Sequence, residues 1–397
     1  MAKKNENEDG GCWPTAQQEL LLRASLLQGK EAIEAWNEWQ SNADVDRLDP
    51  GSHRLLPLLY SNLRAQGIDH PLMGKFRGVY RYTWSKNQML FHHMAGLLRA
   101  FHEAGIKNTL LLKGAALILL YYKDYGLRPM NDFDVLIPME QASKAIRLLQ
   151  EWHWTPVGIS PEKLTEKNVS VTRKNYHGVG FQDSAKRELD LHWHVLRGEL
   201  TNDADNDFWA DAVPSTFYDV PVYVLNPADQ LLHICVHGAM WNKLPPLRWI
   251  ADAMMIFKTS PKIDWNRLVT QAEQRRLILP LRDTLNYLRD RVDAPIPPTI
   301  LQRLQDMPVS MAESLEYQAT TRDPLIFKNR VLNLWFQSQH GLPRTSHVGW
   351  LPKILGFIRY LKRRWNLNHF WQIPFYAVWK FRYGKKDNRT IIKFKNL

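Results

Sequence analysis

The chain has 397 residues, 45% of them hydrophobic and 23% charged, a composition typical of globular proteins that argues against a disordered chain. Its two cysteines, Cys12 and Cys235, exclude a disulfide framework and a multi-cysteine metal site. The net charge of +12 comes from residues 344–397, which hold 13 Lys/Arg and one acidic residue, while the rest holds 39 of each. A polyanionic partner is therefore expected only at this C-terminal tail.

No targeting or spanning segment is expected. The N-terminus is charged and is not followed by an apolar stretch, so no secretory signal is predicted. The most apolar stretch, 109–122, is interrupted by Lys113 and is shorter than the roughly 18 residues of a membrane span. We expect a cytoplasmic protein that is at most peripheral to a membrane.

The first hundred residues carry helical periodicity. After a disordered start at 1–12, helices are predicted at three places, 15–39, 52–66 and 71–104, with the last ending at Gly105.

A mixture of strands and helices follows Gly105. Predicted strands are 108–112, 132–137, 168–173, 178–182 and 187–195, and predicted helices are 115–122 and 141–152. This order predicts an α+β fold with a small mixed sheet and helical flanks. We divide the chain into an N-terminal helical region (1–105), a catalytic core (106–200), a helical annex (201–330, with 226–294 largely helical) and a basic aromatic tail (331–397).

Two strands of this core carry carboxylates. Asp132 and Asp134 share one face of their strand because alternate residues point the same way, and Asp190 repeats the geometry on a later strand. Neighbouring carboxylates repel each other unless a cation lies between them, and oxygen ligands favour Mg²⁺. The alternative is a solvent-facing edge of an amphipathic strand.

The turn at Lys113-Gly114 favours the metal-site interpretation. A strand ends there and a helix begins, so backbone N–H groups can meet phosphate oxygens, and Gly114 lets the backbone approach closely. Lys113 and Arg128 add positive charge, although Arg128 could also be a surface residue. Asn131 is expected only to shape its loop.

Several segments resemble the uncharacterised nucleotidyltransferase family of the DNA polymerase β-like superfamily. They are Leu111–Leu117, Gly126–Val135, Glu188–Trp193, Asn226–Gly238 and Leu247–Asp252, and together they cover about residues 105–290. Most of the superfamily has Gly-Ser at the turn where this chain has Lys-Gly-Ala.

The resemblance implies a catalytic and metal-binding set of Asp132, Asp134 and Asp190, with Gly114 at the nucleotide-binding turn. It implies two Mg²⁺ ions and a nucleoside triphosphate substrate, with ATP the expected one. The acceptor is left open among a protein side chain, a sugar, a lipid-linked glycan and an RNA end.

Histidines stand near these segments. His192 and His194 are expected on the face of Asp190, where His192 is interpreted either as a base or acceptor-positioning residue or as a partner of Asp190. His233 and His237 share a helix face, and with Asp252 they suggest either a zinc site or, as we favour, hydrogen bonds that order the annex.

The tail mixes aromatic and basic residues. The mixture suits nucleic acid, an anionic membrane surface, or plain packing on the core with a solvated basic face. Its aromatic residues are Trp350, Phe357, Tyr360, Trp365, Phe370, Trp371, Phe375, Tyr376, Trp379 and Phe381.

The leading hypothesis is a Mg²⁺-dependent nucleotidyltransferase. One competing class is an inactive protein of the same fold that recruits RNA or anionic lipid through the tail. Another is a phosphotransferase that uses the same metal site, because a fold alone does not define a reaction.

Overall fold

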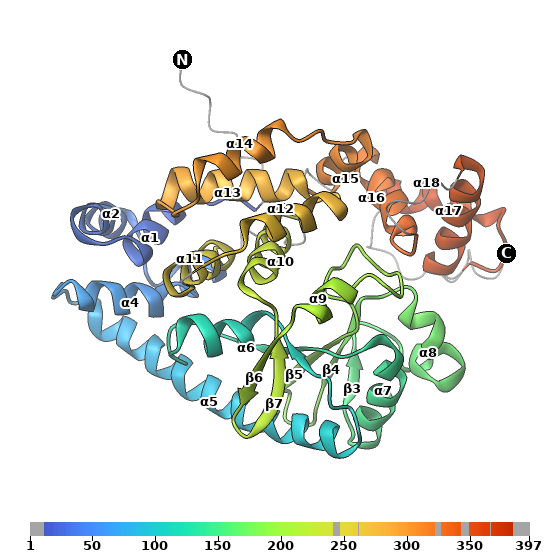
Figure 1. Cartoon of the computed structure of the whole chain (residues 1–397), viewed down its shortest axis with the longest axis horizontal. Helices are drawn as coiled ribbons and strands as arrows, with labels where there is room; N and C mark the ends of the chain where they lie inside the picture. The colour runs from blue at the N-terminus through green and yellow to red at the C-terminus, as the bar shows by residue number, and fades with distance from the viewer. Residues whose placement is uncertain are drawn as a thin grey trace.

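A computed structural model describes residues 12–240, 247–260, 262–321, 327–342, 349–365 and 367–383; the first eleven residues and the end of the tail lie outside these ranges. One mixed sheet of seven strands has the order β3-β4-β5-β2-β1-β7-β6, and its helical flanks confirm the predicted α+β fold (Figure 1). The strands are β1 (Leu110–Leu111), β2 (Asp132–Leu136), β3 (Thr155–Val157), β4 (Gly178–Gln182), β5 (Glu188–His192), β6 (Val213–Phe217) and β7 (Val220–Val224).

The N-terminal helices follow the prediction, with one break near Gly29 and another between His53 and Leu56. A helix expected at 15–39 is two helices that meet at Gly29, whose φ of +63° few other residues adopt. The long helix α5 ends at Glu103, just before Gly105 as expected, and the Ile106 N–H donates to the Phe101 carbonyl at 2.8 Å. The helices are α1 (Ala16–Leu26), α2 (Gly29–Asn42), α3 (Pro50–His53), α4 (Leu56–Ala65) and α5 (Met73–Glu103).

In the sheet region, one segment predicted as a strand is a helix. Residues 168–173, predicted as a strand, lie in a helix, α8. Val169 and Thr172 are buried three positions apart on it, so tertiary packing overrides β-propensity. The elements are α6 (Lys113–Leu117), the π-helix η2 (Ile118–Tyr122), η3 (Met139–Gln141), α7 (Ala142–Glu151), η4 (Pro161–Leu164), α8 (Glu166–Arg173) and α9 (Asn206–Ala210).

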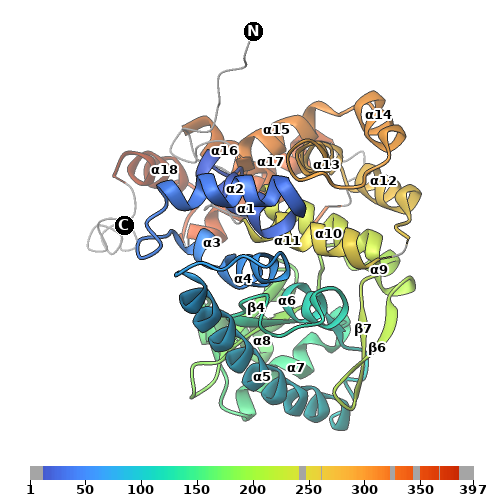
Figure 2. The same cartoon turned by 90° about the vertical axis from the view of Figure 1, so that its left-hand side faces the viewer.

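The two faces of the sheet are covered differently. Phe133, Val135 and Leu191 pack in one core cluster with α5 and α7, whereas Leu136, from the opposite face of β2, packs with the annex helices. Figures 1 and 2 show these helices above the sheet and α5 on its other side. The annex helices are α10 (Pro227–Met240), α11 (Arg248–Thr259), α12 (Trp265–Gln274), α13 (Ile278–Val292), α14 (Pro298–Asp306) and α15 (Met311–Thr321).

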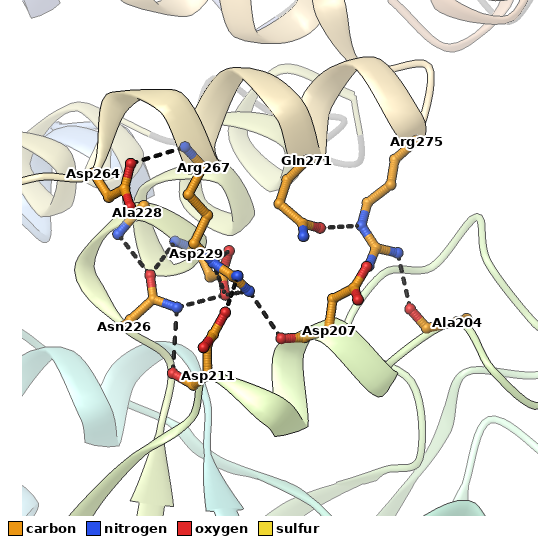
Figure 3. A network of polar contacts seen from close by, with 10 residues as sticks. All are labelled: Ala204, Asp207, Asp211, Asn226, Ala228, Asp229, Asp264, Arg267, Gln271 and Arg275. Carbon is orange, nitrogen blue, oxygen red and sulfur yellow. Dashed lines mark hydrogen bonds and ion pairs between the residues drawn. The ribbon is translucent and has the colours of Figure 1, made fainter.

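A polar network fixes the annex to the segment between β5 and β6 (Figure 3). Arg267 of α12 pairs with Asp229 of α10 at 2.7 Å and with Asp211, and it donates to the Asp207 carbonyl at 2.8 Å. Arg275 donates to the Ala204 carbonyl at 2.9 Å. The position of α10 over the sheet is therefore set by charged hydrogen bonds as well as by apolar packing.

The tail forms three helices with a core cluster of their own. Leu361, Trp365, Leu367 and Tyr376 are buried together, with Leu334 packed against them. The helices are α16 (Phe327–Gln339), α17 (Trp350–Trp365) and α18 (Gln372–Tyr383). None of the described helices is long and apolar enough to cross a bilayer.

Candidate active site

The site begins with two neighbouring parallel strands, β2 and β5. Their register places Asp134 directly opposite Asp190 and Asp132 opposite Glu188, so the carboxylates project from one face of the sheet. The convergence expected if the two strands were neighbours is thus realised for Asp134 and Asp190.

Asp134 is the centre of the site. Its side chain is buried, and Oδ1 accepts from Lys113 Nζ at 2.5 Å and contacts His192 Nε2 at 3.0 Å. Burial acts to raise the pKa of Asp134, but the charge of Lys113 and the His192 hydrogen bond outweigh it and hold this pKa well below its usual value. Asp134 is therefore an anion held between two nitrogen groups.

The negative charge of Asp190 is less compensated by its neighbours than that of Asp134. It is half-buried, and burial together with the charge of Asp134 raises its pKa above the usual value. Asp134, Asp190 and His192 each offer one ligand atom, and these atoms all lie within 4.8 Å of one another. Asp132 is not in this group, although it lies on the same face and its charge acts on Lys113.

The residues present fit a divalent cation. Two carboxylates and an imidazole form its potential ligand set, with the oxygen donors that Mg²⁺ and Mn²⁺ prefer. The neighbouring strand β4 has Gly180 opposite Asp190, where a Cβ atom would lie 3.0 Å from Asp190 Oδ1. The glycine keeps the surroundings of this carboxylate open on that side.

The histidines of β5 separate in space. His192 lies on the carboxylate face and contacts Asp134, which differs from the partnership with Asp190 considered from the sequence. Its Nδ1 is buried without a hydrogen-bond partner among the described residues, and its ring centre lies 5.2 Å from that of His177. β5 ends at His192, so His194 turns away and contacts Asp205 at 2.6 Å.

The Lys113-Gly114 turn is shaped by Arg128. Lys113 has a φ of 44° and begins α6, and a Cβ on Gly114 would lie 2.7 Å from Arg128 Nη1. Arg128 itself is buried and bonds Asp252 through Nε at 2.7 Å and Nη2 at 2.8 Å. Gly114 is thus needed for the close approach of this arginine, which lies at the turn as the sequence indicated.

A further arginine at this place escaped the sequence analysis. Arg248 donates to the Pro129 carbonyl at 3.0 Å, and burial, helped by the charge of Arg128, lowers its pKa to about 10. The single negative charge of Asp252 therefore acts on two positive charges, those of Arg128 and Arg248. Arg248 lies in the segment 247–252 that carried the family resemblance, and this was the available signal.

The histidines of α10 approach the site from the annex. Burial and the charges of Lys113 and His192 lower the pKa of His233 to about 3, and its Nδ1 has no hydrogen-bond partner among the described residues. Asp252 is occupied by Arg128 and by Tyr122, whose hydroxyl lies 2.9 Å away. Among the described residues, His233, His237 and Asp252 form no metal-ligand group.

We expect the stability of the protein to fall with acid below pH 6.5. In the folded state the pKa of His233 is about 3, so between its ordinary value of 6.5 and about 3 only the unfolded chain binds this proton. The expected slope is about 1.4 kcal/mol per pH unit for this residue. Thermal unfolding at pH 4–7 should show a slope reduced by that amount in His233→Asn.

His53→Asn is the control for this experiment, because His53 is an exposed histidine. A His233→Asn slope equal to that of the wild type would contradict a buried neutral imidazole.

A mixed sheet with paired carboxylates on adjacent strands and cationic side chains beside them is an arrangement found in nucleotidyltransferases. The sequence profile of a family described as uncharacterised nucleotidyltransferase matches residues 51–293, more than half of the chain. The chain belongs to this family. A search of curated proteins finds no match.

Proposed function

We propose that the protein transfers a nucleoside monophosphate from a nucleoside triphosphate to an acceptor hydroxyl and releases pyrophosphate. The acceptor oxygen bonds to the α-phosphorus, the bond from this phosphorus to the bridging oxygen breaks, and the acceptor proton passes to a base. The observation that carries the proposal is the direct opposition of Asp134 and Asp190 on parallel strands, in a chain of this family.

Asp134 and Asp190 would hold Mg²⁺, with His192 orienting Asp134 through its 3.0 Å contact. Asp132, on the same face, completes the proposed set of three carboxylates, which a second ion would need. Bound Mg²⁺ would neutralise the triphosphate and favour departure of pyrophosphate.

The cationic residues have a separate role. Lys113, with Arg128 and Arg248 beside the Gly114 turn, offers positive charge to the triphosphate oxygens. Arg128 is held rigidly by Asp252, so it would contribute a fixed charge with little loss of side-chain entropy on binding. We expect ATP as the triphosphate, and the acceptor is a protein side chain, a sugar, a lipid-linked glycan or an RNA end.

One contact favours a second candidate function. Lys113 Nζ lies 2.5 Å from Asp134 Oδ1 and compensates this carboxylate without a metal ion. The chain would then be a protein of the same fold without catalytic activity, which recruits RNA or anionic lipid through its basic tail. In both cases we place the protein in the cytoplasm, where the tail would bring it to a polyanionic surface.

Incubating the full chain with each α-³²P-labelled triphosphate and a cell extract should label one class of acceptor in the presence of Mg²⁺. The label should be lost with EDTA and return with added Mg²⁺ or Mn²⁺, because oxygen donors accept both ions. γ-³²P-labelled triphosphate should leave the acceptor unlabelled, since the γ-phosphate departs in pyrophosphate.

Two outcomes would contradict the proposal. Label from the γ-position alone would show a phosphotransferase. No label from any triphosphate, together with unchanged Mg²⁺ binding in Asp134→Asn by calorimetry, would favour the inactive candidate.

A further inference from the structure

The most exposed apolar residues of the tail gather on and after α17. Trp350 is 69%, Leu351 56% and Leu355 52% exposed, whereas Leu361 and Trp365 of the same helix are buried. With about 3.6 residues per turn, Trp350, Ile354, Leu361 and Trp365 lie within about 60° of arc. One apolar stripe therefore runs along α17, covered in its C-terminal half and exposed in its N-terminal half.

The turn before α18 adds two exposed aromatic residues to this part of the tail. Lys362 lies on the same side of α17 as Leu351 and Leu355, and its Nζ is 4.7 Å from the ring centre of Phe370. Phe370 and the adjacent Trp371 are 51% and 54% exposed. We call Trp350, Leu351, Ile354, Leu355, Phe370 and Trp371 the C-terminal surface.

Positive charge surrounds the C-terminal surface. Residues 349–383 hold seven Lys/Arg and no Asp or Glu. Arg359 and Arg363 are exposed and lie outside the apolar stripe of α17. A second copy of the chain placed on this surface would bring like charges together, so charge complementarity points to an anionic partner.

We propose that the C-terminal surface docks on an anionic lipid membrane. An amphipathic helix with aromatic and aliphatic residues on one face and basic residues around it binds lipid by inserting the apolar face among anionic headgroups. Half of the residues of this surface are aliphatic: Leu351, Ile354 and Leu355, which lie together near the start of α17. Aliphatic side chains do not stack on bases, and this favours lipid over nucleic acid.

Helix α16 connects the helices of the C-terminal surface to the proposed catalytic region. Leu334 of α16 packs against the cluster of α17 and α18, and the His340 carbonyl beyond α16 accepts from the Leu200 N–H at 3.0 Å. Leu200 lies in the segment that follows β5, so a docked tail is connected by packing and a hydrogen bond to the strand of Asp190.

Flotation of the full chain with vesicles tests the proposal. Phosphatidylcholine vesicles with about one third phosphatidylglycerol should bind the protein, and phosphatidylcholine alone should bind it at least tenfold more weakly. Raising the salt from about 0.1 M to about 1 M, which shortens the Debye length to about 3 Å, should weaken binding to the anionic vesicles.

Variants separate the apolar from the ionic contribution. Leu351→Ser with Leu355→Ser should lower vesicle binding about tenfold or more, because these side chains would otherwise leave water on insertion. Arg359→Glu with Arg363→Glu should remove the preference for anionic vesicles. Met89→Ser, on α5 and 72% exposed, is the matched control and should bind as the wild type.

The positions are exposed, so these variants should fold, and circular dichroism checks this. Wild-type vesicle binding by the Leu351→Ser, Leu355→Ser variant would overturn the proposal. Salt-sensitive binding to single-stranded RNA without binding to anionic vesicles would overturn it as well, in favour of nucleic acid.

Discussion

Asp134→Asn is expected to lower the rate of nucleotidyl transfer at least about a thousandfold, because Asp134 is the central carboxylate of the proposed catalytic set. The amide keeps the shape of the carboxylate in its buried place on β2 and can still accept from Lys113 or His192. It removes the negative charge that a cation at the site requires. Initial rates with labelled triphosphate and saturating Mg²⁺ measure the effect.

Glu188→Gln is the matched control for this substitution. Glu188 lies on the same face of the sheet, opposite Asp132, and accepts from Gln182 Nε2 at 3.2 Å. It is outside the ligand group, so its loss should change the rate by no more than about threefold, as for residues away from the reacting atoms. Equal rates for Asp134→Asn and Glu188→Gln would end the carboxylate-site hypothesis.

Asp190→Asn distinguishes binding from chemistry at the same site. The third carboxylate is proposed to act mainly in the transition state, so turnover should fall by several orders of magnitude while the affinity for triphosphate is largely kept. If the variant loses nucleotide binding and keeps its turnover at saturation, the role assigned to Asp190 is wrong.

The ion pair between Asp134 and Lys113 changes the stability that the sequence predicts for Asp134 variants. Two repelling carboxylates predict little cost, or even a gain, on removing one of them. In the folded protein Asp134 compensates the partly buried Lys113, so Asp134→Ala would leave this ammonium with fewer partners. The isosteric Asn is for this reason the better test.

Local periodicity predicted much of the site. The period of two along 132–136 and 188–192 placed the aspartates on one face of each strand, and both strands exist. Their pairing was a condition in that argument, because the register of distant strands depends on the whole sheet rather than on either segment. The structure meets the condition for Asp134 and Asp190.

Other parts depend on contacts that no local pattern reveals. β6 and β7 come from residues 213–224, outside the expected core, and β7 pairs in parallel with the two-residue strand β1. The strand predicted at 168–173 is helical because α8 packs its buried side onto the sheet region. His194 leaves the predicted face because β5 ends two residues earlier, where Asp205 binds the imidazole.

The partner of Arg128 is the clearest case of a long-range contact. Asp252 is 124 residues away in sequence, and the pair lies buried between the sheet region and α11. Arg128→Met is expected to lower the unfolding free energy by about 3–5 kcal/mol, because it leaves the buried Asp252 with the Tyr122 hydroxyl as its one remaining hydrogen-bond donor among the described residues. Thermal unfolding should show a decrease in Tm of about 4–6 °C.

Arg99→Met is the matched control, because Arg99 makes a similar fork to Asp219 on the surface, with Nε 2.8 Å from Oδ2. Water compensates an exposed carboxylate, so this substitution should change the Tm little. A Tm for Arg128→Met equal to that of Arg99→Met would contradict a structural role for the buried pair.

The double variant Arg128→Met with Asp252→Leu separates structure from nucleotide binding. Replacing both buried charges by apolar side chains of similar size should restore much of the lost stability. If Arg128 also offers charge to the triphosphate, this stable variant should bind the triphosphate about tenfold more weakly, the scale of one hydrogen bond to a charged group. Calorimetric titration with a non-hydrolysable triphosphate measures the difference, and wild-type affinity would leave Arg128 with a structural role alone.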